Sequence, residues 1–97
     1  MEIRIQSVKF DADKKLVAFI EEKVSKLDRF ADDILAADVT LKLDKDSSEH
    51  ANKVAVLKLD VAGDTPVAER RSKSFEEAVD LAIDAVKVQL SKHKNKA

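Results

Sequence analysis

The stretch that decides the fold is DADKKLVAFIEEKVSKLDRF, residues 11–30. Its apolar residues recur at the spacing of one helix face. They are Leu16, Ile20, Val24 and Leu27. An aspartate at position 11 or 13 can cap the free amide groups of the first turn. Residues 2–9 before this helix and 38–44 after it alternate apolar with polar side chains, which is typical of strands with one wet face. A strand, a helix and a strand in this order predict two parallel strands joined by a right-handed crossover.

The second half of the chain predicts two more strands and one more helix. Residues 53–61 alternate again, and the turn at 62–64 leads into a short strand at about 65–71. Pro66 lacks a backbone donor and is expected at a sheet edge. Ser74 and Glu77 have the spacing of a capping box that opens a helix running to about Lys92. The predicted fold is therefore α+β, in the order β-α-β-β-β-α. It has a four-stranded mixed sheet and two helices packed on one face.

Composition bounds the class of protein. Ninety-seven residues make one domain, which we place at residues 1–92, followed by a basic tail at 93–97. The absence of cysteine excludes disulfides and thiolate chemistry. No apolar run reaches the roughly 20 residues that a membrane span needs, and the N-terminus lacks the apolar stretch of a signal peptide. A cytoplasmic protein without a membrane partner is expected.

Basic residues are concentrated in two segments of the chain. Their total is nevertheless balanced, with 18 lysine and arginine residues against 19 aspartate and glutamate residues. The predicted first helix carries four bases, Lys15, Lys23, Lys26 and Arg29. The end of the chain carries four more positions that can contact phosphate, Lys87, Lys92, His93 and Lys94. If the basic edges of the two helices border one groove, they form a site for a polyanion. The alternative is a solvated helix face with local ion pairs such as Glu22–Lys26.

Little else in the sequence indicates chemistry. The paired acids fall in caps, loops and outward helix positions, where a carboxylate keeps its water and is a poor general acid or base. His50 and His93 are far apart in polar contexts. The sequence lacks a glycine-rich phosphate loop, an HExxH motif and a nucleophile elbow. No catalytic residue, metal, cofactor or small-molecule substrate is predicted.

Apolar residues bear on two further questions, the kind of RNA that the protein could recognise and its contact with another protein. Only four phenylalanines are present, and Phe19 and Phe75 fit the core, so few aromatic rings remain to stack on single-stranded bases. Recognition of structured RNA by shape and phosphate fits better.

A second apolar stripe lies on the outer side of the last helix and consists of Leu81, Ala85 and Val88. Scattered surface apolar residues are common, and the alternative is a small contact with a protein partner or a second copy.

Three segments resemble a known family. They are Met1-Glu2-Ile3-Arg4-Ile5, residues 19–30, and residues 78–84 with 89–94. The chain resembles the ribosome hibernation-promoting factors, or ribosome-associated inhibitors, of bacteria and plastids. The resemblance implies a fold similar to double-stranded-RNA-binding domains, and binding to the small ribosomal subunit where messenger and transfer RNA would sit. It also implies a role in resting or starved cells, and a short form without the further dimerising domain. The family's RNA-facing bases match Lys23, Lys26 and Arg29, and then Lys87, Lys92 and Lys94.

The chain also departs from the family pattern. Val88 stands where a basic residue is frequent, Ala85 and Ser91 lie near other such positions, and Glu76 replaces a usual aromatic residue. Fewer bases on the second helix predict weaker phosphate binding.

The hypothesis from sequence is a non-enzymatic inhibitor that binds ribosomal RNA and excludes messenger and transfer RNA. Three alternatives stay open at this point. They are a general structured-RNA-binding module, a protein-interaction adaptor that uses Leu81, Ala85 and Val88, and, last, an enzyme built on the acidic residues.

Overall fold

The structure, a computed structural model, describes residues 1–44 and 51–95, with side chains as far as residue 92. Its elements follow the predicted order. They are β1 (Glu2–Ser7), α1 (Lys14–Ser25), the 3₁₀-helix η1 (Lys26–Arg29), β2 (Ile34–Leu43), β3 (Lys53–Val61), β4 (Val67–Ser72) and α2 (Phe75–Asn95).

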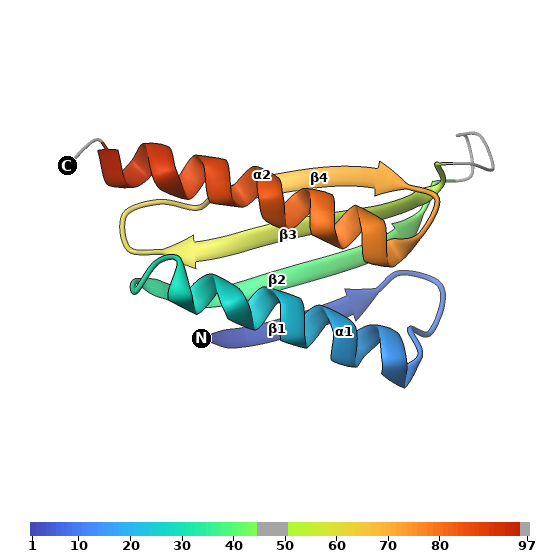
Figure 1. The fold of residues 1–97 in the computed structure, drawn as a ribbon. Coiled ribbons are helices and arrows are strands. Elements are labelled where there is room, and N and C mark those ends of the chain that lie inside the picture. The colour runs from blue at the N-terminus through green and yellow to red at the C-terminus, as the bar shows by residue number, and fades with distance from the viewer. Residues whose placement is uncertain (45–50, 96–97) are drawn as a thin grey trace.

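The four strands form one mixed sheet in the order β1-β2-β3-β4. Strands β1 and β2 are parallel, and the other two pairs are antiparallel. Figure 1 shows α1 and α2 side by side on the same face of this sheet. The predicted fold class is thereby confirmed, with Pro66 directly before the edge strand β4.

Element boundaries differ from the sequence prediction in ways that the backbone explains. Strand β2 begins at Ile34 instead of residue 38, because a register shift between Ile34 and Ala36 breaks the alternation there. The first helix ends at Ser25, and its last predicted turn is the 3₁₀-helix η1, which still buries Leu27. The last helix continues to Asn95, three residues beyond the predicted end.

The core lies between the sheet and the two helices. Leu41, Leu57 and Leu59 of the sheet are at most 2% exposed. Apolar residues of the helices close over them, namely Ile20, Val24, Val79, Ala82, Val86 and Leu90. The ring of Phe10 stacks on Phe75 with centroids 5.0 Å apart, which ties the loop after β1 to the start of α2. Because both helices bury their apolar sides against this one face of the sheet, their other sides remain exposed to solvent.

Side-chain caps start both helices. The backbone amide of Leu16 donates to Asp13 Oδ1 at 2.7 Å, so Asp13 is the residue that caps α1. The amide of Glu77 donates to Ser74 Oγ at 3.1 Å, which forms the first half of the predicted capping box. These bonds satisfy amide groups that have no partner within their own helix.

Replacing Asp13 with alanine is expected to lower the free energy of unfolding by about 1 kcal/mol, because an orphan amide of α1 loses its acceptor. Denaturant unfolding followed by circular dichroism measures this change. Asp11→Ala is the matched control, since Asp11 is exposed and makes no capping bond in the part of the chain described. Equal losses from the two variants would contradict the cap assignment.

Candidate nucleic-acid interface

A groove of about 320 Å³ runs between the two helices. Lys23 and Lys26 line it from the end of α1 and the start of η1, and α2 lines it with Asp80, Ile83, Asp84 and Lys87. The spacing explains the assembly, because residues three or four apart share one side of a helix. Three of the predicted bases are therefore brought together from segments far apart in the sequence.

The Lys23 ammonium is positioned by an aromatic ring. Its Nζ lies 5.5 Å from the centroid of Phe19, one turn earlier on α1. The residue is half-buried, so its aliphatic stem lies on apolar surface while its charged end borders the groove. A cation over a ring face is attracted by the ring quadrupole, which restricts where this charge can lie.

Lys26 forms the ion pair that the alternative interpretation predicted. Its Nζ lies 4.0 Å from Glu22 Oε1, and the two side chains are 53% and 72% exposed. An exposed pair at this separation contributes little stability, about 0.3–0.5 kcal/mol for an i,i+4 pair. Such a pair leaves the Lys26 ammonium available to another anion.

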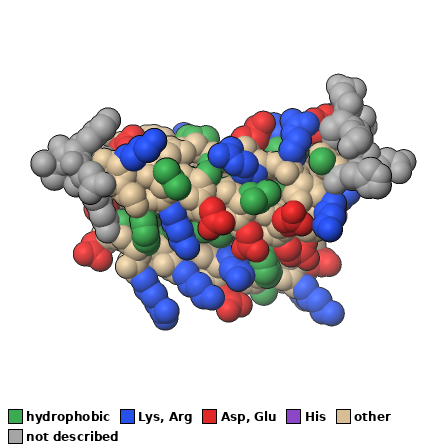
Figure 2. All heavy atoms as spheres, turned by 45° about the horizontal axis from the view of Figure 1, so that its top comes forward, with side chains coloured by type: hydrophobic (Ala, Val, Ile, Leu, Met, Phe, Trp, Pro, Cys, Tyr) green, Lys and Arg blue, Asp and Glu red, His purple; other side chains and the backbone are tan. Residues whose placement is uncertain are grey.

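Two carboxylates share the groove with the lysines. Asp80 and Asp84 line it beside Lys87, which is half-buried. The sequence interpretation treated these acids only as solvated helix positions. Their i,i+4,i+7 spacing with Lys87 is the signal that could have placed all three on one side of α2. Figure 2 shows the same mixture, with acidic and basic side chains interleaved over the face of the molecule that it presents.

The other predicted residues stand apart from the groove. Lys15, Arg29 and Lys92 are exposed, and none of them lines it. The side chains of His93 and Lys94 lie outside the described residues, as does His50. The common surface formed by both helices therefore rests on Lys23, Lys26 and Lys87.

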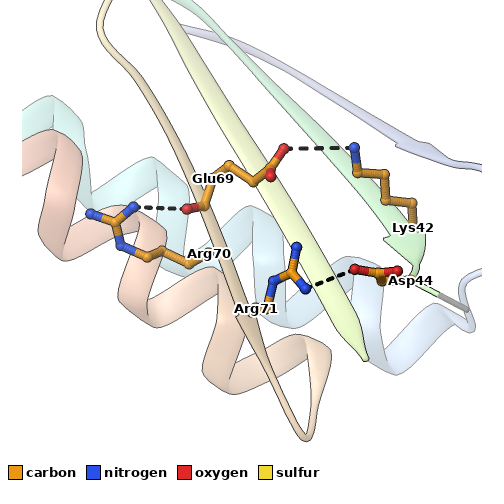
Figure 3. Close-up of polar contacts among 5 residues, drawn as sticks. All are labelled: Lys42, Asp44, Glu69, Arg70 and Arg71. Carbon is orange, nitrogen blue, oxygen red and sulfur yellow. Dashed lines mark hydrogen bonds and ion pairs between the residues drawn. The ribbon is translucent and has the colours of Figure 1, made fainter. Parts of the chain in front are cut away.

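The opposite face of the sheet offers a contrast, because most of its bases have carboxylate partners. Arg71 Nη1 lies 2.7 Å from Asp44 Oδ2, and Lys42 Nζ lies 3.6 Å from Glu69 Oε1. Figure 3 shows both pairs as dashed lines. Arg4 forms two hydrogen bonds to Asp38, of 2.6 and 3.0 Å. The hydrogen bond and the charge of Asp38 raise the pKa of Arg4 above its ordinary value.

A shallow hollow of about 560 Å³ also lies on this side. Val54 lines this hollow and is only 1% exposed, although its side chain points away from the helices. Lys42, Glu69 and Arg71 line the same hollow, so their two ion pairs border it.

The described residues contain no cluster of three or more histidine, aspartate or glutamate side chains that could hold a metal ion. None of the helices within residues 1–44 and 51–95 combines the length and hydropathy needed to cross a membrane.

The fold and the groove define a small α+β domain with basic residues of both helices at one surface. The family model described as "Sigma 54 modulation protein / S30EA ribosomal protein" matches residues 3–97, and the chain belongs to this family.

Two relatives carry related names. A ribosome hibernation promotion factor of Deinococcus radiodurans is 39% identical over 79 residues, which are 80% of this chain and 41% of that protein. A ribosome hibernation promoting factor of Azotobacter vinelandii is 30% identical over 96 residues, which are 99% of this chain and 85% of that protein. The chain thus spans about two fifths of the first relative and most of the second.

Two solved structures share the fold. The N-terminal domain of Protein Y from Thermus thermophilus superposes with a TM-score of 0.80 at 23% identity, over 96% of this chain and 99% of that one. A ribosomal subunit interface protein from Coxiella burnetii also gives a TM-score of 0.80 at 23% identity, over 98% and 99%.

Removing one groove carboxylate with Asp80→Asn is expected to strengthen binding to a polyanion, because repulsion beside Lys23 and Lys87 falls. The salt concentration that elutes the protein from immobilised heparin measures the effect and should rise. Glu21→Gln is the matched control, since it removes one exposed charge from α1 outside the groove. Equal shifts in both variants would show that only net charge matters.

Proposed function

We propose that this protein is a ribosome hibernation factor that binds the small ribosomal subunit through phosphates of its ribosomal RNA. Family membership and the names of the relatives support a ribosome-associated inhibitor of translation. The proposed place of action is the cytoplasm. The protein acts without turning over a substrate, by occupying the site of messenger and transfer RNA.

The observation that carries this proposal is the convergence of Lys23, Lys26 and Lys87 on one groove. Phosphate groups of a folded RNA lie several ångströms apart on a rigid surface, so a set of cations fixed by two packed helices can engage several of them together. Lys15, Arg29 and Lys92 are exposed outside the groove, and we place them in contacts with neighbouring phosphates.

Each phosphate contact releases a bound counterion, so affinity falls steeply as salt rises. Asp80 and Asp84 oppose these contacts within the groove. The proposed complex is therefore salt-sensitive and weaker than three lysines alone would give. Inhibition follows from steric exclusion, because a folded domain bound there leaves no room for messenger or transfer RNA.

The double variant Lys23→Glu, Lys26→Glu is expected to lose co-sedimentation with purified small subunits, because two attractive contacts become repulsive. Wild type should co-sediment at low salt and dissociate progressively as salt rises. Circular dichroism should show the same fold for both proteins, since neither lysine is in the buried core.

Lys42→Glu, Lys58→Glu is the matched control, because it makes the same change in net charge with two exposed residues on the opposite face of the sheet. This control should co-sediment like wild type. Retained binding by the groove variant, or equal loss by both variants, would refute the role assigned to the groove.

The main alternative is a general binder of structured RNA, which the same groove chemistry also permits. Titration of a fluorescent RNA duplex under the same conditions separates the two functions. The hibernation proposal predicts weaker binding to the free duplex than to small subunits. Equal affinities would favour the alternative.

A further inference from the structure

We propose that the outer side of α2 is a contact surface for a second copy of this chain, with the two α2 helices antiparallel about a two-fold axis. Leu81 and Val88 are 41% and 56% exposed there, although both are large apolar residues. Ala85 is adjacent to them but packs partly against the core, so it marks the edge of this surface that faces the core. The proposal does not depend on ribosome binding.

Four residues define the surface. At about 100° per residue, Glu77, Leu81, Val88 and Lys92 fall within roughly 60° of one another on the helix. Leu81 and Val88 are separated by about 10 Å along the axis, and the two charges stand one turn outside them. The result is a narrow stripe with an acid at one end, two apolar residues in the middle and a base at the other end.

Neither terminal charge has a partner at hand. The residues one turn inward from Glu77 and Lys92 are Leu81 and Val88, so the usual i,i+4 ion pair is absent. Glu77 and Lys92 form no ion pair with any side chain that the structure describes. Both are exposed and free to meet a charge from outside.

The order of the stripe makes it complementary to itself. The midpoint of Leu81 and Val88 falls between residues 84 and 85, and so does the midpoint of Glu77 and Lys92. An antiparallel copy centred there places Leu81 against Val88 of the other copy, and Glu77 against its Lys92. Both contacts occur twice, as a two-fold interface requires. Another protein could bind this stripe in the same way only if its own surface presented the same order of charged and apolar residues.

The same geometry limits the strength of the contact. Asp84 lies beside the central axis, so the two copies bring two carboxylates near each other. The stripe is also narrower than the surface that a specific, stable interface buries. Association is therefore expected only at high protein concentration.

Reversal of single charges tests the arrangement. Glu77→Lys and Lys92→Glu, each alone, are expected to weaken association about tenfold or more, because attraction becomes repulsion at both ends. An equimolar mixture of the two variants should associate at least as tightly as wild type, since every pair across the interface is then opposite in charge. Sedimentation equilibrium at low salt and protein concentrations up to the millimolar range measures each case.

Circular dichroism checks that each variant folds, because Glu77 lies in the first turn of α2. A wild type that stays monomeric throughout the range overturns the proposal. So does a mixture that associates no better than either variant alone, since the contact then lacks this geometry.

The central carboxylate supplies a second, independent readout. Asp84→Asn is expected to tighten self-association several-fold, because the repulsion at the axis disappears. Asp80→Asn is the matched control: both carboxylates line the groove, but Asp80 lies one turn from the axis and farther around the helix from the stripe, so its removal should change self-association much less. Equal effects of the two substitutions would overturn the predicted axis.

Discussion

The confinement of the core to one face of the sheet is the constraint on which the rest of this structure depends. Inward residues of β2 and β3, such as Leu41, Leu57 and Leu59, are nearly inaccessible, whereas the opposite face is covered largely by charged and short side chains. Both helices must therefore pack on the same side, because their apolar stripes have no other surface to cover. Two neighbouring helices leave a groove between them, and their polar edges become its walls.

The positive charge of the groove depends on the positions in which its lysines are held. Phe19 restricts the ammonium of Lys23, and packing of α2 restricts Lys87. On the opposite face, Arg71 and Lys42 are engaged by carboxylates across strands. Bases of similar number are thus present on both sides. Among the described residues, however, the groove lysines share the groove with Asp80 and Asp84 without a close ion pair to either, and Lys26 has only its exposed pair with Glu22. Position, more than net charge, distinguishes the two faces.

Period and capping patterns in the sequence predicted the element order, the single covered face and the helix starts, because each depends on local side chains. The early start of β2 was missed, since the register shift near Ala36 destroys the alternation on which the prediction relied. The sequence predicted that Lys23 and Lys26 belong to the bases of the first helix. That Lys87 joins them, and that Asp80 and Asp84 do so too, depends on how α2 rotates when it packs. No local pattern fixes that rotation fully.

The acids of the groove also bear on what kind of anion the protein can hold. Glu76 and Glu77 lie in the first turn of α2, where a negative charge is favoured by the helix dipole. Asp80 and Asp84 lie beyond that turn, where the dipole's effect has faded, so the helix dipole does not account for them. A single phosphate ion entering the groove meets both carboxylates. An extended phosphate array can engage Lys23, Lys26 and Lys87 while it reaches exposed bases outside, such as Lys15 and Arg29. The acids therefore favour large, rigid polyanions over small ones, as the proposed function requires.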